Sequence, residues 1–361
     1  MILLDNRRSV SLTVLLVAAA CGKPDQGART QSAGVDTVRA PSARELAYVT
    51  NEDSQDLTVI DTHGETVIAT IPVGTRPRGV KVSPDGRTVF VALSGSPKCP
   101  PSMPDEECEK LKSDKSKDGI AQVDIAGRRV TRILPGGSDP EQFDINRDGS
   151  LLYVSNEDAG TASIVEVATG RIRMTVPVGV EPEGVRLSPD GKTFHVTAET
   201  DHVVTTLDAE TGKNLGQVEV GRRPRDLAFL SDGRLAYVTA EVEGTVSVID
   251  VPHHSVLTVI RLPEGARPMG VVVSPDDQRV YVATGRGGTI EVIDVATNQI
   301  VGSVKVGQRP WGLALTEDGR KLYTANGPSN DVSVVDTQTL QVLKTIPAGK
   351  IPWGVAIGLG N

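Results

Sequence analysis

The stretch Tyr48-Val-Thr-Asn51, followed by Leu57-Thr-Val-Ile-Asp61, Ile71-Pro-Val-Gly74, Arg76-Pro-Arg-Gly79 and Ser83-Pro-Asp-Gly86, decides the fold of this chain. Its phrases return around most of the 361 residues. The position of the first tyrosine recurs, at intervals of 42, 63, 42, 42, 44 and 42 residues, at Phe90, Tyr153, His195, Tyr237, Tyr281 and Tyr323. The long interval is one period plus an insertion of 21 residues. So regular a period indicates stacked or radial supersecondary units.

Each repeat contains four short strand patterns. The first two are exemplified by Gly184–Ser188 and Phe194–Thr197, which flank the turn Pro189-Asp-Gly191. Proline presets φ for such a turn, and glycine accepts positive φ. The third and fourth patterns are exemplified by Thr245–Asp250 and Thr175–Gly179. β-Branched and polar residues alternate in these phrases, which favours strands over helices, and four strands per radial repeat predict a β-propeller.

The repeat resembles the YVTN family of β-propeller repeats over about residues 45–358. The proline of the x-Pro-x-Gly phrase occurs at Pro77, Pro140, Pro182, Pro224, Pro268, Pro310 and Pro352, which predicts seven blades. The repeats begin at a second strand (Leu46–Thr50) and stop after a first strand (Gly354–Gly358), so both ends are expected to share the last blade. That pairing closes the ring and removes exposed sheet edges. We therefore predict an all-β, seven-bladed propeller with four antiparallel strands per blade over residues 45–361.

The first 20 residues have the features of an export signal. Arg7-Arg8 precede an apolar run, Leu12–Ala20, that is too short to span a bilayer. The small residues before Cys21 resemble the signal of bacterial lipoproteins, and an ordinary cleavage site with an incidental cysteine is the alternative. The resemblance implies lipidation of Cys21 and a periplasmic or cell-surface protein, at the outer membrane if the cell has one. Residues 21–44 are then a flexible tether.

Composition narrows the classes of partner. The formal net charge of −8 opposes nucleic-acid binding, whose affinity rests on neutralising phosphates. Only 3% of the residues are aromatic, while 37 glycines and 23 prolines suit many short strands joined by tight turns. We expect a monomer that touches the membrane through its lipid anchor alone.

The residues of the x-Pro-x-Gly phrases differ between blades and should ring the mouth of the central channel, on the face that we call the upper face. The residue after the proline is, from blade one to blade seven, Arg78, Glu141, Glu183, Arg225, Met269, Trp311 and Trp353. It is charged in four consecutive blades and apolar in the next three. This predicts an amphipathic ligand site, in which the indoles hold an apolar group and the charges orient polar groups. The alternative is that the charges pair between blades and the tryptophans pack the ring.

Two further features lie on the same face. The insertion in blade one, residues 95–117, carries Cys99 and Cys108. In an exported protein such a pair predicts a disulfide rather than free thiols, and its spacing does not fit a zinc site. The second strands end in oxygen-rich residues, Asn51-Glu-Asp53, Asn156-Glu-Asp158, Glu199 and Glu241, which could hold Ca²⁺ but also suit turns. We expect no metal and no cofactor.

Three functions are compatible with these patterns. A non-catalytic scaffold that binds a small molecule or protein at the upper face is favoured, because the sequence shows no isolated nucleophile and base. It also contains neither a Gly-x-Ser-x-Gly elbow nor a phosphate-binding loop. The alternative is a lactonase-type hydrolase, because seven-bladed lactonases resemble this repeat family. It would use Glu141 or Glu183 as a base and Arg78 or Arg225 to hold an oxyanion. A resemblance to the haem d1 domain of nitrite reductases implies an axial histidine near the channel, and the inner phrases contain none.

Overall fold

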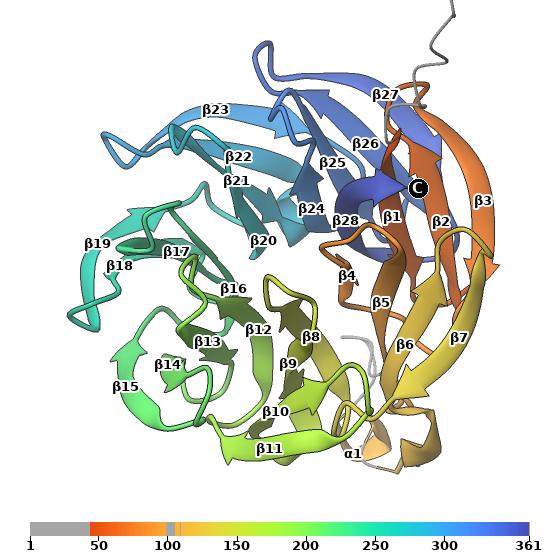
Figure 1. The fold of residues 1–361 in the computed structure, drawn as a ribbon. Helices are drawn as coiled ribbons and strands as arrows, with labels where there is room; N and C mark the ends of the chain where they lie inside the picture. Colours follow the sequence, from red (N-terminus) through yellow and green to blue (C-terminus); the bar gives the residue numbers. More distant parts are fainter. Residues whose placement is uncertain (1–43, 99–104, 109, 361) are drawn as a thin grey trace, which may run out of the picture. The chain divides into compact units, whose positions relative to one another are not determined.

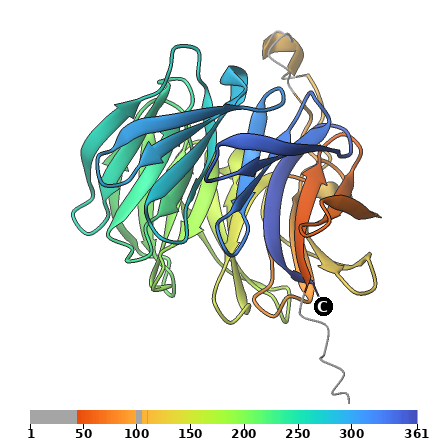
Figure 2. The same ribbon diagram turned by 90° about the horizontal axis from the view of Figure 1, so that it is seen from above.

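The computed structural model describes residues 44–98, 105–108 and 110–360. These residues form seven four-stranded antiparallel sheets arranged around a central axis (Figures 1 and 2). The predicted all-β, seven-bladed propeller is therefore confirmed. No helix of the described residues is long and apolar enough to cross a membrane. The predicted signal peptide, Cys21 and the tether lie outside the described residues, apart from Arg44.

The blades are given from the channel outward. Blades one to four comprise β4 (Val80–Val82), β5 (Thr88–Leu93), β6 (Gly119–Asp124) and β7 (Arg129–Leu134); β8 (Pro140–Ile145), β9 (Leu151–Asn156), β10 (Thr161–Glu166) and β11 (Ile172–Pro177); β12 (Pro182–Leu187), β13 (Thr193–Ala198), β14 (Val203–Asp208) and β15 (Asn214–Glu219); and β16 (Pro224–Phe229), β17 (Leu235–Ala240), β18 (Thr245–Asp250) and β19 (Ser255–Arg261). Blades five to seven comprise β20 (Pro268–Val273), β21 (Arg279–Thr284), β22 (Thr289–Asp294) and β23 (Gln299–Lys305); β24 (Pro310–Leu315), β25 (Lys321–Asn326), β26 (Asp331–Asp336) and β27 (Gln341–Pro347); and β28 (Pro352–Gly360), β1 (Arg44–Asn51), β2 (Asp56–Asp61) and β3 (Thr66–Pro72). The short helices are α1 (Asp105–Cys108), η1 (Lys115–Lys117), η2 (Glu157–Ala159) and η3 (Gly285–Gly287).

The two ends of the propeller meet in blade seven. Strand β1 lies beside β28 (Figure 1) and pairs with it antiparallel, with Tyr48 opposite Ala356. The innermost strand of this blade thus comes from the C-terminal end of the chain, while its other three strands come from the N-terminal end. The predicted closure is confirmed.

The threonine of the Tyr-Val-Thr phrase joins neighbouring blades. The Thr50 hydroxyl donates to the Arg78 carbonyl at 2.7 Å, and the Thr239 hydroxyl donates to the Met269 carbonyl at 2.6 Å. Each acceptor is the mouth residue of the next blade. Because these hydroxyls and carbonyls are buried, the bonds satisfy groups that water cannot reach. They also hold the mouth residues at one level of the channel.

The glycine of the x-Pro-x-Gly phrase allows the inner strands to approach one another. A Cβ added to Gly184 would lie 2.6 Å from the Arg225 carbonyl oxygen of the next blade, and one added to Gly312 would lie 2.7 Å from that of Trp353. A side chain would therefore clash with backbone at these positions. Gln142 and Asp226 take this position in blades two and four.

The insertion in blade one contains helix α1, which we did not predict from the sequence. This helix follows β5 in the chain and projects from one face of the ring (Figure 2). Its base is held by hydrogen bonds, since Asp114 N donates to the Gly95 carbonyl at 2.9 Å and Gly95 N donates to the Asp118 carboxylate at 2.7 Å. Cys99 lies outside the described residues, and so the disulfide with Cys108 stays a prediction.

Candidate functional site

Two sets of side chains converge at the upper mouth of the channel. The inner strands β8, β12 and β16 begin at their prolines, which places Glu141, Glu183 and Arg225 just inside the mouth. The second strands end on the same face, and the glutamates that follow them, Glu157, Glu199 and Glu241, point to the same place. The residues that we considered as turn formers or Ca²⁺ ligands thus belong to the mouth.

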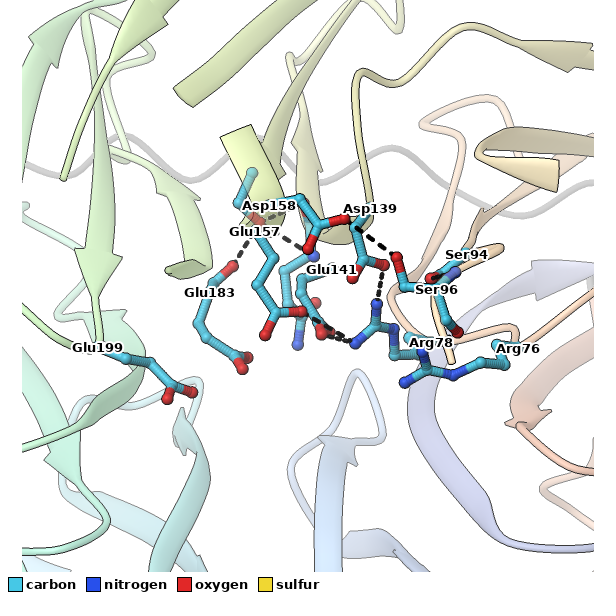
Figure 3. Close-up of polar contacts among 12 residues, drawn as sticks. Arg76, Arg78, Ser94, Ser96, Asp139, Glu141, Glu157, Asp158, Glu183 and Glu199 are labelled. Atoms are coloured by element: carbon cyan, nitrogen blue, oxygen red, sulfur yellow. Dashed lines mark hydrogen bonds and ion pairs between the residues drawn. The ribbon is translucent and has the colours of Figure 1, made fainter. Parts of the chain in front are cut away.

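The first cluster surrounds Arg78. This arginine is buried and forms ion pairs with Asp139 and Glu141 of blade two (Figure 3). Its Nη1 also lies 3.5 Å from the Glu157 Oε2. Three carboxylates from one blade therefore share a guanidinium group from its neighbour.

The second cluster surrounds Arg225. This buried arginine contacts Glu183 and Glu199 of blade three through Nη1. Its Nε and Nη2 each lie 2.8 Å from Glu241 Oε2 of its own blade. Its guanidinium carbon also lies 5.7 Å from the centre of the Trp311 ring, within the range of a cation–π contact. Arg225 therefore links the charged and the apolar sides of the mouth.

Carboxylates outnumber guanidinium groups in these two clusters, and burial makes the excess negative charge costly. Burial, opposed by Arg78 and reinforced by Glu183 and Asp139, raises the pKa of Glu157 to about 8. Burial, together with Glu199, raises the pKa of Glu183 well above its usual value. The mouth can therefore hold and release protons near neutral pH, which is what acid–base chemistry needs.

Three of these carboxylates could also bind a cation. Oxygens of Glu141, Glu157 and Glu183 lie within 4.8 Å of one another, and Glu141 Oε2 is buried without a hydrogen-bond partner among the described residues. Arg78, however, already contacts Glu141 and Glu157 and supplies positive charge at this point. The raised pKa values of Glu157 and Glu183 indicate that protons supply more.

The insertion contributes to the rim of the mouth. Lys115 of η1 forms an ion pair with Asp158, the residue after Glu157, and the Ser96 hydroxyl donates to the same carboxylate at 3.1 Å. Arg76 forms an ion pair with Glu52, with 3.0 Å between Nε and Oε1. The base of the insertion therefore fixes the turn that carries Glu157 (Figure 3).

Inside the mouth lies a cavity of about 520 Å³. Of the predicted site residues, Glu183, Arg225, Met269, Trp311 and Trp353 line it. The two indole rings lie 5.5 Å apart between centroids and are tilted by 35°. Arg78 and Glu141 do not line this cavity. Their charges are paired between blades one and two, as the alternative interpretation of the mouth predicted.

A second layer of charges lies deeper in the channel, and we did not predict it from sequence. Lys81 Nζ lies 3.1 Å from Asp144 Oδ1, and Arg186 Nη2 lies 2.9 Å from Asp226 Oδ2. The sequence does contain a sign of this layer, because each of these charged residues adjoins an apolar residue within an inner strand, as Lys81 does between Val80 and Val82. They line the same side of the channel as the upper clusters.

Comparison with known proteins places the chain in a family. The sequence model of the "Lactonase, 7-bladed beta-propeller" family matches residues 37–185 and 179–347. The chain therefore belongs to the seven-bladed β-propeller lactonase family. No curated protein matches it significantly.

Solved structures share the fold at low sequence identity. A putative 6-phosphogluconolactonase from Bacteroides uniformis has a TM-score of 0.70 at 17% identity, covering 87% of this chain and 100% of the other. One from Bacteroides fragilis has a TM-score of 0.71 at 16% identity, covering 89% and 99%. Hydrazine synthase of Kuenenia stuttgartiensis has a TM-score of 0.66 at 20% identity, covering 78% and 89%. At such identities these similarities support the fold alone.

Proposed function

We propose that the protein hydrolyses a cyclic ester at the mouth of its channel. The observation that carries this proposal is the meeting of Glu183 and Arg225 at one wall of a cavity in a chain of the lactonase family. A buried carboxylate with a raised pKa is a stronger base than a free one once it has lost its proton, and a guanidinium group can stabilise an oxyanion. The family match favours this function over the non-catalytic scaffold that the sequence patterns first suggested.

In the proposed reaction, the Glu183 carboxylate takes a proton from a water molecule as that water attacks the ester carbonyl. The resulting tetrahedral oxyanion faces the Arg225 guanidinium. When the ring C–O bond breaks, the leaving oxygen receives a proton, and the product is a hydroxy acid. Glu157 is a suitable proton donor for this step, because its pKa of about 8 keeps it protonated at neutral pH and its carboxylate lies close to that of Glu183.

A binding function without catalysis is the second candidate, and the pairing of the charges favours it. Arg225 already contacts three carboxylates, which is also what a purely structural cluster requires. In that case the cavity captures a small molecule or a segment of a partner at the upper face and releases it unchanged. The two candidates differ in turnover, not in the place of binding.

The decisive experiment measures hydrolysis of a panel of lactones by the purified protein and by Glu183→Gln. Loss of the general base should lower the rate by a factor of about 10²–10⁴. Glu210→Gln is the matched control, because Glu210 is exposed in an outer hairpin. Circular dichroism establishes that both variants are folded. If Glu183→Gln hydrolyses lactones as fast as the wild type, the assigned mechanism is wrong. If the wild type hydrolyses no lactone, the binding function without catalysis is favoured.

We also propose, from its first residues, that the protein is exported as a lipoprotein of the YVTN-repeat type. Cleavage before Cys21 and acylation of that residue would tether the propeller to a membrane through residues 21–44. Expression in a bacterial host with a labelled fatty acid tests this directly. The label should enter the wild-type protein and be lost in Cys21→Ser, while Cys108→Ser should retain it.

A further inference from the structure

Lactones range from sugar phosphates to uncharged rings with alkyl or aryl substituents, and the lining of the cavity discriminates between these classes. Three consecutive inner strands, β20, β24 and β28, supply one wall. Their lining side chains are apolar from the mouth downward, from Met269, Trp311 and Trp353 at the upper end to Val273, Leu315 and Ile357 at the lower end. From Trp311 to Leu315 the strand rises about 13 Å, at about 3.3 Å per residue. The apolar wall is thus long enough to cover a substituent as well as a ring.

The opposite wall is charged, but its cations are already neutralised. Lys81, Arg186 and Arg225 line the cavity. Within the described part of the chain, Lys81 pairs with Asp144 and Arg186 pairs with Asp226, while Arg225 meets three glutamates. A phosphoryl group carries a charge of about −1.5 to −2 and needs unpaired donors. In this cavity it would instead face the carboxylates of Glu183 and Asp226.

The lower end of the cavity is apolar on every side that it touches. Val82, Leu187 and Phe229 continue the ring that Val273, Leu315 and Ile357 begin, and each of the six is only partly buried. Polar groups that could orient a reacting ester are therefore at the upper end, with Glu183 and Arg225. Apolar surface that could bury a substituent fills the lower end and one whole wall.

We propose that the substrate class of this site is an uncharged lactone with an apolar substituent, and not a phosphorylated sugar lactone. This inference rests on the proposed function. The ester ring lies at the mouth, between Glu183, Arg225 and Trp311. The guanidinium carbon of Arg309 lies 4.9 Å from the centre of the Trp311 ring but does not line the cavity. The substituent extends down the channel along β20, β24 and β28, where it displaces water from apolar side chains.

The test is an alkyl-length series of γ-lactones, compared with 6-phosphogluconolactone, in both hydrolysis and binding. The corresponding γ-lactams, which resist hydrolysis, report binding separately through tryptophan fluorescence and calorimetry. We expect lactam affinity and kcat/KM to rise by about fourfold per added methylene until the cavity is filled. Turnover of 6-phosphogluconolactone should be lower than that of the longer alkyl lactones.

Variants make the assignment specific. Leu315→Ala should weaken the length dependence, whereas Leu257→Ala, the same change on exposed surface of β19, should not alter it. Met269→Arg introduces a charged side chain into the apolar wall and should reduce binding of the longest lactam at least tenfold. The length series on the wild-type protein stands even if a variant fails to fold.

The outcomes separate the two proposals. Faster turnover of 6-phosphogluconolactone than of any alkyl lactone overturns the substrate class and leaves the hydrolase intact. Length-dependent binding of lactams without turnover of any lactone supports the site and refutes the hydrolase. Affinity that does not depend on chain length overturns the substrate class.

Discussion

Replacing Arg225 by methionine tests the electrostatics of the mouth most directly. Methionine occupies the equivalent position in the next blade, Met269, so the fold accepts it there. In Arg225→Met, the carboxylates of Glu183, Glu199 and Glu241 lose the guanidinium group that contacts all of them. We expect a destabilised protein whose loss of stability depends on pH.

The magnitude follows from two effects. Removing one partner of a buried ion pair costs about 3–5 kcal/mol when the other charge stays. The carboxylates can avoid this cost by binding protons. In the wild type, burial acts to raise the pKa of Glu241, but Arg225 and Arg223 hold it below the usual value. Without Arg225, the pKa of Glu241 should therefore rise.

The sign of the pH dependence is fixed by these shifts. The raised pKa of Glu183 means that the folded state keeps a proton that the unfolded state releases near pH 4.5, so this group makes stability fall as pH rises above that value. If a carboxylate of the folded variant binds one more proton, the free energy of unfolding of the variant falls with pH more steeply than that of the wild type, by about 1.4 kcal/mol per pH unit. The penalty of Arg225→Met is therefore largest at pH 8 and smallest at pH 5.

Urea denaturation followed by circular dichroism, for both proteins at each pH, measures the penalty. Arg222→Met is the matched control, because Arg222 precedes Arg225 by three residues and pairs on the surface with Glu243. Its effect should be far smaller, as exposed pairs contribute little. A penalty of equal size at pH 5 and pH 8 would refute proton uptake by the buried carboxylates, and with it the acid–base role proposed for them.

Three more predictions test the blade contacts and the reaction. Gly184→Ala places a Cβ against the Arg225 carbonyl and should destabilise the protein by about 1–3 kcal/mol in thermal unfolding, while Gly327→Ala, whose Cβ meets nothing closer than 3.7 Å, should be nearly neutral. Thr239→Val leaves the buried Met269 carbonyl without its 2.6 Å hydrogen bond and should cost about 1–3 kcal/mol, unlike Thr131→Val on exposed β7. The rate of lactone hydrolysis, corrected for the spontaneous reaction, should rise with pH over a range well above 4.5, because the base must be deprotonated and its pKa is raised. A rate that is already constant from pH 5 upward contradicts the assignment of Glu183.

The repeat period predicted the blades, the closure and the ring of mouth residues, since each depends on local phrases that recur. Which charged side chains form ion pairs with one another could not be predicted from the repeat. Glu157 and Glu199 follow second strands, and the sequence does not say which arginine of a neighbouring blade each one meets. Arg78 and Arg225 occupy equivalent positions, yet only Arg225 lines the cavity. That difference depends on the neighbours: carboxylates enclose Arg78, whereas Trp311 lies beside Arg225.

Pairing of the charges and binding of a ligand are compatible in the site that we propose. A free arginine or glutamate at the mouth would sample many rotamers and lose entropy on meeting a substrate. Ion pairs with Glu199 and Glu241 hold Arg225 in place beside Trp311, and Arg225 in turn orients Glu183. Burial, with Glu199 beside it, raises the pKa of Glu183, so the proposed base takes up and releases its proton at a higher pH than a free glutamate does. Such preorganisation needs charged residues on adjacent blades, which explains why the charges occupy consecutive repeats and leave the remaining three for the apolar wall.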